Sequence, residues 1–282
     1  METAVRDRQR SRTGAPPIPA AQSPRRGSRR SRGLASALVP PAAVLVVLLV
    51  VWESAVRLLD LPTYLLPSPS AIAGSFSGEW GELARHTRAT AVSAVLGYLI
   101  GNGFALVLAA VMAEFRSVEN ALYPWMLALR SLPVVALAPL LIIWFGFTIW
   151  PIVAATALIC FFPTLVNGIQ GFKSTDETTL QLMRGLNASR GEVFRLVKVP
   201  TATPMIFAAL KISVASALVG AVVGEWISSK EGLGYLTIVA SNYVDTLLLF
   251  RAIVAVAVIA IVWFLVVQAL ESWALRWQRT GR

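Results

Sequence analysis

Six runs of about 20 mainly apolar residues recur along this chain, and a helix of that length spans the hydrocarbon core of a bilayer. We expect these spans at about 38–59, 90–112, 121–144, 150–169, 204–227 and 247–270. Charged residues make up only 14% of the chain, against roughly 25% in water-soluble domains. The sequence therefore predicts an all-α membrane protein with six transmembrane helices.

Positive charge is distributed unevenly around these spans. Nine of the 25 basic residues lie in the first 33 positions. If the N-terminus is cytoplasmic, the inner segments carry 18 basic residues and the outer segments carry four. Since basic residues are retained on the cytoplasmic side, we expect a multi-pass protein of the plasma membrane. Both termini and the segment 173–200 should then be cytoplasmic.

The pattern divides the chain into four parts. Residues 1–33 should form a disordered basic tail that touches anionic lipid rather than nucleic acid. Residues 34–60 carry the first span, residues 61–274 carry the other five, and residues 275–282 form a cytoplasmic tail.

Small residues distinguish the second predicted span, and prolines distinguish the third. The second span is rich in glycine and alanine, which let membrane helices approach closely; its expected contact face contains Gly97, Gly101 and Gly103. The third span should be one bent helix, because it contains Pro124, Pro133 and Pro139.

The 28-residue segment 173–200 is predicted to contain two helices. The first covers 176–186, and Asn187 ends it because asparagine tolerates the left-handed conformation. The second begins at Ser189, with Glu192 at capping-box spacing, and prolines should end it; these are Pro200 and Pro204.

An apolar stripe runs along the first of these helices. It is formed by Leu180, Met183 and Leu186, with Leu182 nearby. Such a stripe on a cytoplasmic helix pair needs a partner. It could be a separate protein or the chain's own membrane helices, and the pattern alone leaves both open.

The segment from Thr179 to Arg190, followed by Val197-Lys198-Val199-Pro200, resembles the cytoplasmic loop of type I ATP-binding-cassette importer permeases. That family's loop reads Glu-Ala-Ala, three residues, Gly, then Leu-Pro. Here Gln181-Leu182-Met183 replaces Glu-Ala-Ala, and Asn187 stands at the glycine position. The resemblance implies that the loop docks on an ATPase. The docking residues it implies are Leu182, Met183, Gly185, Leu186, Asn187, Ala188, Ser189, Val199 and Pro200.

Other stretches resemble the nitrate, sulfonate and taurine branch of that family, including Leu66-Pro67-Ser68-Pro69-Ser70 and Gly232-Leu233-Gly234-Tyr235-Leu236. The stretch Gly220 to Glu225 is most similar to members for pyrimidine-type vitamin precursors or riboflavin. The resemblance implies two ATPase copies, a second copy of this chain and an external substrate-binding protein. It leaves the solute open between a sulfonate-, nitrate- or taurine-like anion and a vitamin precursor.

The sequence offers few of the residues that an enzyme or a metal site would need. The spans offer no nucleophile with a base, no suitably placed carboxylate pair and few metal ligands, so we expect neither an enzyme nor a cofactor. A secondary transporter remains the alternative, although no internal repeat is visible. Polar residues inside spans are costly. Those that could line a translocation pathway are Arg130, Asn167 and Glu225.

Overall fold

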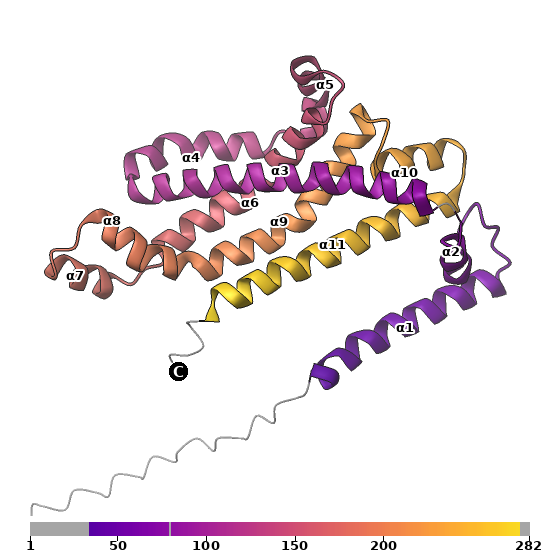
Figure 1. The fold of residues 1–282 in the computed structure, drawn as a ribbon, viewed down its shortest axis with the longest axis horizontal. Helices are drawn as coiled ribbons and strands as arrows, with labels where there is room; N and C mark the ends of the chain where they lie inside the picture. Colours follow the sequence, from indigo (N-terminus) through magenta and orange to yellow (C-terminus); the bar gives the residue numbers. More distant parts are fainter. Residues whose placement is uncertain (1–33, 79, 277–282) are drawn as a thin grey trace, which may run out of the picture. The chain divides into compact units, whose positions relative to one another are not determined.

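The computed structural model describes residues 34–78 and 80–276, and all regular secondary structure in them is helical (Figure 1). The helices are α1 (Leu34–Leu58), α2 (Pro69–Ser75), α3 (Trp80–Glu114), α4 (Arg116–Arg130), α5 (Val134–Phe145), α6 (Trp150–Lys173), α7 (Glu177–Gly185), α8 (Arg190–Val193), α9 (Val199–Ser228), α10 (Leu233–Asn242) and α11 (Thr246–Ala274), with a π-helical turn η1 (Phe194–Lys198) between α8 and α9. The all-α prediction is confirmed.

The described residues fall into two compact units that divide within α1, between Leu49 and Val50. All packing described below lies within the second unit. The predicted tail at 1–33 and the last residues of the predicted tail at 275–282 lie outside the described residues.

Helices α3, α6 and α9 form the core of the second unit (Figure 1). Small residues set their separation. A Cβ added at Gly97 would lie 2.6 Å from Thr156 Cγ2, and one at Gly220 would lie 2.7 Å from Thr156 Cα. Gly101 likewise faces the backbone of α6, whereas Gly103 faces open space. The predicted glycine face is thus confirmed at two of its three positions, because α6 covers only one side of α3.

Two ends of this core can be told apart by their polar contacts. At the loop end, from which α7 and α8 extend, Lys198 at the start of α9 pairs with Glu114 at the end of α3 (2.5 Å). At the distal end, Thr90 near the start of α3 donates to Glu225 near the end of α9 (3.0 Å). Helices α3 and α9 are therefore antiparallel. Since Lys173 at the end of α6 pairs with Glu119 near the loop end, α6 runs parallel to α3.

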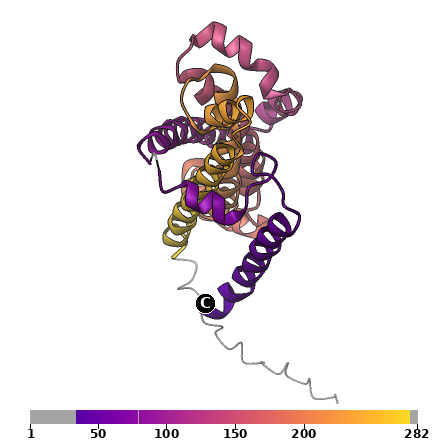
Figure 2. The ribbon, with the colours of Figure 1, turned by 90° about the vertical axis from the view of Figure 1, so that its right-hand side faces the viewer.

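The connection between α3 and α6 must return the chain from the loop end to the distal end, and α4 and α5 make this return. They differ from the single bent span expected at 121–144. The two helices meet at 100°, and residues 131–133 break them apart. Pro133 stands at the break, where the residue before a proline disfavours helical backbone. Figure 2 shows this pair at the edge of the bundle.

The predicted number of spans is compatible with this structure. Among the described residues, four continuous helices are long and apolar enough to cross a membrane, and the count rises to five if the broken α4–α5 pair is one span. Helix α1 has 25 residues. At ~1.5 Å per residue its length is about 37 Å, enough to cross a hydrocarbon core of ~30 Å.

Candidate functional site

The segment that follows α6 folds as a compact helical loop at the loop end. Helix α7 ends in a left-handed turn at Asn187, whose φ is +56°. The turn is closed by hydrogen bonds from Asn187 N to the Arg184 carbonyl (2.9 Å) and from Ala188 N to the Met183 carbonyl (3.0 Å). The predicted role of Asn187 as a turn residue is confirmed, since the helix can end there without glycine.

A capping box starts the second helix of the loop, as the spacing predicted. Ser189 Oγ accepts from Glu192 N (3.3 Å), and Ser189 N donates to the Glu192 carboxylate (2.7 Å). These bonds satisfy two of the backbone donors that a helix start leaves free. The chain direction between α7 and α8 is therefore set by local hydrogen bonds.

The second loop helix does not end at Pro200 or Pro204, contrary to the sequence prediction. It continues from Arg190 through η1 into α9, so that one helix runs to Ser228. A proline ring crowds the carbonyl four residues earlier and offers no N–H. The π turn lies immediately before Pro200, and there Val199 N donates to the Phe194 carbonyl, five residues back. This wider turn lets the helix pass the proline.

The apolar stripe of α7 is divided between protein and solvent. Leu180 and Met183 are half-buried, while Leu182 and Leu186, one turn apart, are 62% and 68% exposed. Met183 is thus less exposed than Leu186, and a contact face shared by the two stays a prediction. Among the other predicted docking residues, Gly185, Asn187, Ser189 and Val199 are exposed and Ala188 and Pro200 half-buried.

The three predicted pathway residues do not come together. Arg130 is exposed at the last position of α4, directly before the break. Asn167 is half-buried in α6 and donates to the Pro163 carbonyl in its own helix (2.7 Å). Glu225 in α9 is only 2% exposed. A role in the pathway stays a prediction for all three.

Glu225 instead holds the start of α10. Its Oε2 accepts from Thr90 Oγ1 (3.0 Å) and from Gly234 N (2.7 Å). Thr90 Oγ1 in turn accepts from Leu233 N (2.7 Å). A carboxylate beside the free N–H groups of a helix start is favourable because the helix dipole is positive there. We call this set of contacts the distal clamp.

His86 completes the distal clamp. Its Nδ1 accepts from Gly232 N (2.9 Å), and the side chain is 2% exposed. Gly232 has φ +115°, a conformation that residues with a Cβ rarely adopt. The sequence alone assigned no role to His86 or Thr90. Both form part of the clamp because α3 brings them under the Gly232-Leu233-Gly234 motif.

A cavity of about 770 Å³ opens beside the clamp at the distal end. Its lining includes three basic side chains, Arg85, Arg88 and Lys230, together with Glu225 and Glu231. The basic residues outnumber the exposed acid, so this opening suits a solute or a protein surface with negative charge.

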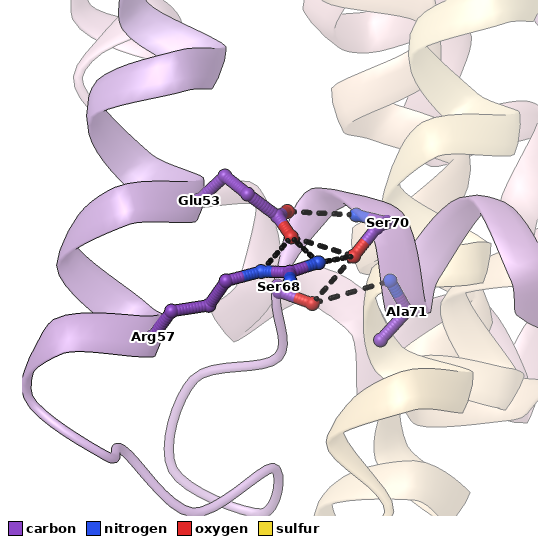
Figure 3. A network of polar contacts seen from close by, with 5 residues as sticks. All are labelled: Glu53, Arg57, Ser68, Ser70 and Ala71. Atoms are coloured by element: carbon purple, nitrogen blue, oxygen red, sulfur yellow. Dashed lines mark hydrogen bonds and ion pairs between the residues drawn. The ribbon is translucent and has the colours of Figure 1, made fainter.

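The stretch Leu66-Pro67-Ser68-Pro69-Ser70, which carries part of the family resemblance, also forms a defined local structure (Figure 3). Ser68 caps α2 by accepting from Ala71 N (3.2 Å). Glu53 near the end of α1 accepts from Ser70 N (3.0 Å) and pairs with Arg57 (2.6 Å). The serines and the proline of this motif therefore start a short helix that Glu53 fixes.

The arrangement is that of the membrane subunit of a transporter: broken and continuous spans, a helical loop at one end with exposed leucines, and a charged cavity at the other. Residues 101–276 match the family described as binding-protein-dependent transport system inner membrane component. The chain belongs to this family.

Curated relatives agree with this membership. The formylaminopyrimidine transport permease protein ThiX of Halalkalibacterium halodurans is 33% identical over 85% of this chain and 96% of the relative. The riboflavin transport system permease protein RibX of Chloroflexus aurantiacus is 36% identical over 83% and 88%, respectively. A putative aliphatic sulfonates transport permease protein, SsuC of Bacillus subtilis, is 29% identical over 89% and 91%. This chain is the transmembrane permease subunit of an ATP-binding-cassette importer, and nothing found supports a secondary transporter.

Proposed function

We propose that this permease imports a small heteroaromatic solute of the pyrimidine-precursor or flavin type. The support is the similarity to two permeases named for formylaminopyrimidine and riboflavin, at 33% and 36% identity. An aliphatic sulfonate is the second candidate. It is favoured by the similarity to SsuC at 29% identity and by the basic lining of the distal cavity.

We also propose that residues 173–200 dock on a separate ATPase subunit. The observation that carries this proposal is the pair of exposed leucines, Leu182 and Leu186, on a helix whose end is fixed by the Asn187 turn. Two large apolar side chains on one face of a short helix gain free energy when a partner covers them. The Asn187 turn and the Ser189–Glu192 capping box hold the two loop helices together, so that movement of the bound ATPase would also move α8 and the start of α9.

The remaining proposals concern topology and assembly. The excess of basic residues at the loop end supports cytoplasmic placement of this end and of both termini. Residues 61–274 would form the permease core. One docking loop per chain supports an assembly of two permease chains with two ATPase subunits, and the mass of the purified complex tests this copy number.

Uptake measurements test the proposed solute. The permease, produced with its ATPase and binding protein in cells or reconstituted in vesicles, should take up labelled riboflavin or labelled formylaminopyrimidine in an ATP-dependent way. Labelled ethanesulfonate is the matched competitor from the sulfonate class. Uptake of ethanesulfonate alone would replace the heteroaromatic proposal with the sulfonate one.

A further inference from the structure

The corner between α3 and α4 lies at the loop end and carries an acid on each side. Helix α3 ends at Glu114, helix α4 begins at Arg116, and only Phe115 joins them, with φ −116° and ψ 96°. Glu119 lies in the first turn of α4. A change of direction at one extended residue makes this corner a hinge between the core helix α3 and the broken pair α4–α5.

The two acids pair with lysines at the two ends of the docking loop. Lys198, the last residue of η1, contacts Glu114 (2.5 Å), and their side chains are only 17% and 23% exposed. Lys173, the last residue of α6, contacts Glu119. Both ends of the loop are thus tied to the same corner, one on each side of the hinge.

An apolar cluster lies behind these ion pairs. Phe194 of η1 packs against Phe172 of α6 in a tilted ring pair, with ring centroids 5.4 Å apart. Phe194 packs against the same buried cluster as Val118 and Leu122 of α4. Because close-packed side chains transmit displacement, movement of η1 is passed to α4 through this cluster as well as through the charges.

Open space lies beside the α3–α4 corner. A cavity of about 610 Å³ lies beside it and is lined by Glu114, Glu119, Tyr123 and Lys173. No residue of α4 is fully buried, and its packing on the cluster rests on partly buried side chains such as Val118 and Leu122, so rotation of α4 would shift these contacts rather than break a buried core. Helix α5 beyond it contacts α6 and α9 and buries Ala138 and Leu141, so a turn of α4 would shift α5 against the core helices.

We infer that the pairs Lys198–Glu114 and Lys173–Glu119 couple the docking loop to the α3–α4 corner, so that displacement of the loop by the ATPase turns α4 and moves α5. This inference rests on the proposal that residues 173–200 bind the ATPase. It makes these four residues positioning residues for transport, distinct from the leucines that hold the partner.

The test follows α5 directly and needs no knowledge of the solute. A single cysteine at Ala136, exposed on α5, is introduced in a Cys160→Ala background. In the complex with its ATPase, the labelling rate by a thiol reagent should change when ATP and vanadate are added. Glu114→Lys should reduce this ATP-dependent change about 2- to 30-fold, the usual range for residues that carry coupling, while the ATPase stays bound. The charge exchange Glu114→Lys with Lys198→Glu should restore it.

Lys211 and Glu271 supply a matched control. They form an ion pair between α9 and α11 at 2.8 Å, with similar exposure of 24% and 21%, and neither residue belongs to the segment 173–200. Lys211→Glu should leave the ATP-dependent change in place. If Glu114→Lys fails to insert, the milder Glu114→Gln and Glu119→Gln carry the test.

The inference is overturned if the parental complex shows no ATP-dependent change at Ala136→Cys. It is also overturned if Glu114→Lys retains the change, if the charge exchange fails to restore it, or if Lys211→Glu loses it equally. Failure of the docking proposal gives a different result: the ATPase would then bind with unchanged affinity after truncation of Leu182 and Leu186.

Discussion

Truncation of Leu182 in α7 and Leu186 at its C-cap tests the docking surface most directly. Leu182→Ala with Leu186→Ala removes three side-chain carbons from each position, worth about 0.8 kcal/mol per carbon when fully buried. The side chains are 62% and 68% exposed in the free chain, so roughly two thirds of this free energy is still available to a partner. The double variant should therefore weaken ATPase binding by about 3 kcal/mol, or ~100-fold in Kd.

The assay is the affinity of the purified permease for its ATPase, measured together with co-purification from membranes. Because both leucines already face solvent, the thermal stability of the permease alone should change little. Leu58→Ala is the control, since Leu58 is 83% exposed at the end of α1 and far along the chain from the loop. A double variant that binds the ATPase with the parental Kd would refute the docking surface.

Three further predictions concern the turn, the distal clamp and the topology. Asn187→Gly should retain ATPase binding and uptake, whereas Asn187→Val should lower both, because a β-branched residue at φ +56° costs about 1–2 kcal/mol; equal uptake by both variants would contradict this. Gly234→Ala places a Cβ 2.5 Å from the Val222 carbonyl oxygen and 2.9 Å from a carboxylate oxygen of Glu225, so it should destabilise the detergent-solubilised protein by about 1–3 kcal/mol, seen as a lower thermal midpoint, and an unchanged midpoint would contradict the close approach of α10 to α9 at the clamp. A cysteine at Arg190 in a Cys160-free background should stay unlabelled by an impermeant reagent outside intact cells, and labelling there would reverse the proposed orientation.

Local sequence determined the features that depend on neighbours along the chain. The apolar runs required helices of membrane-spanning length, because a lipid-exposed backbone must satisfy its own hydrogen bonds. The left-handed turn at Asn187 and the Ser189–Glu192 capping box were predictable because each involves residues within five positions of one another. The ATPase-docking role was suggested by the motif and remains a proposal.

Tertiary structure decided which side of each helix meets another part of the chain. Periodicity placed Met183 and Leu186 on one stripe, but it could not show that Met183 would be half-buried and Leu186 exposed. Pro200 indicated a helix end, yet a π turn, a feature without a sequence pattern of its own, carries the helix past it. Proline content indicated a bend in the third span but could not give its angle of 100°.

The polar contacts that matter most are the ones that no local pattern reveals. Thr90 and Glu225 are 135 positions apart, and Glu114 and Lys198 are 84 positions apart. Each residue alone is compatible with a solvated or lipid-interface position, and only the packing of α3 against α9 brings the partners within hydrogen-bonding distance. A charge near a helix end acquires a structural role through its partner, and the fold alone determines which partner that is.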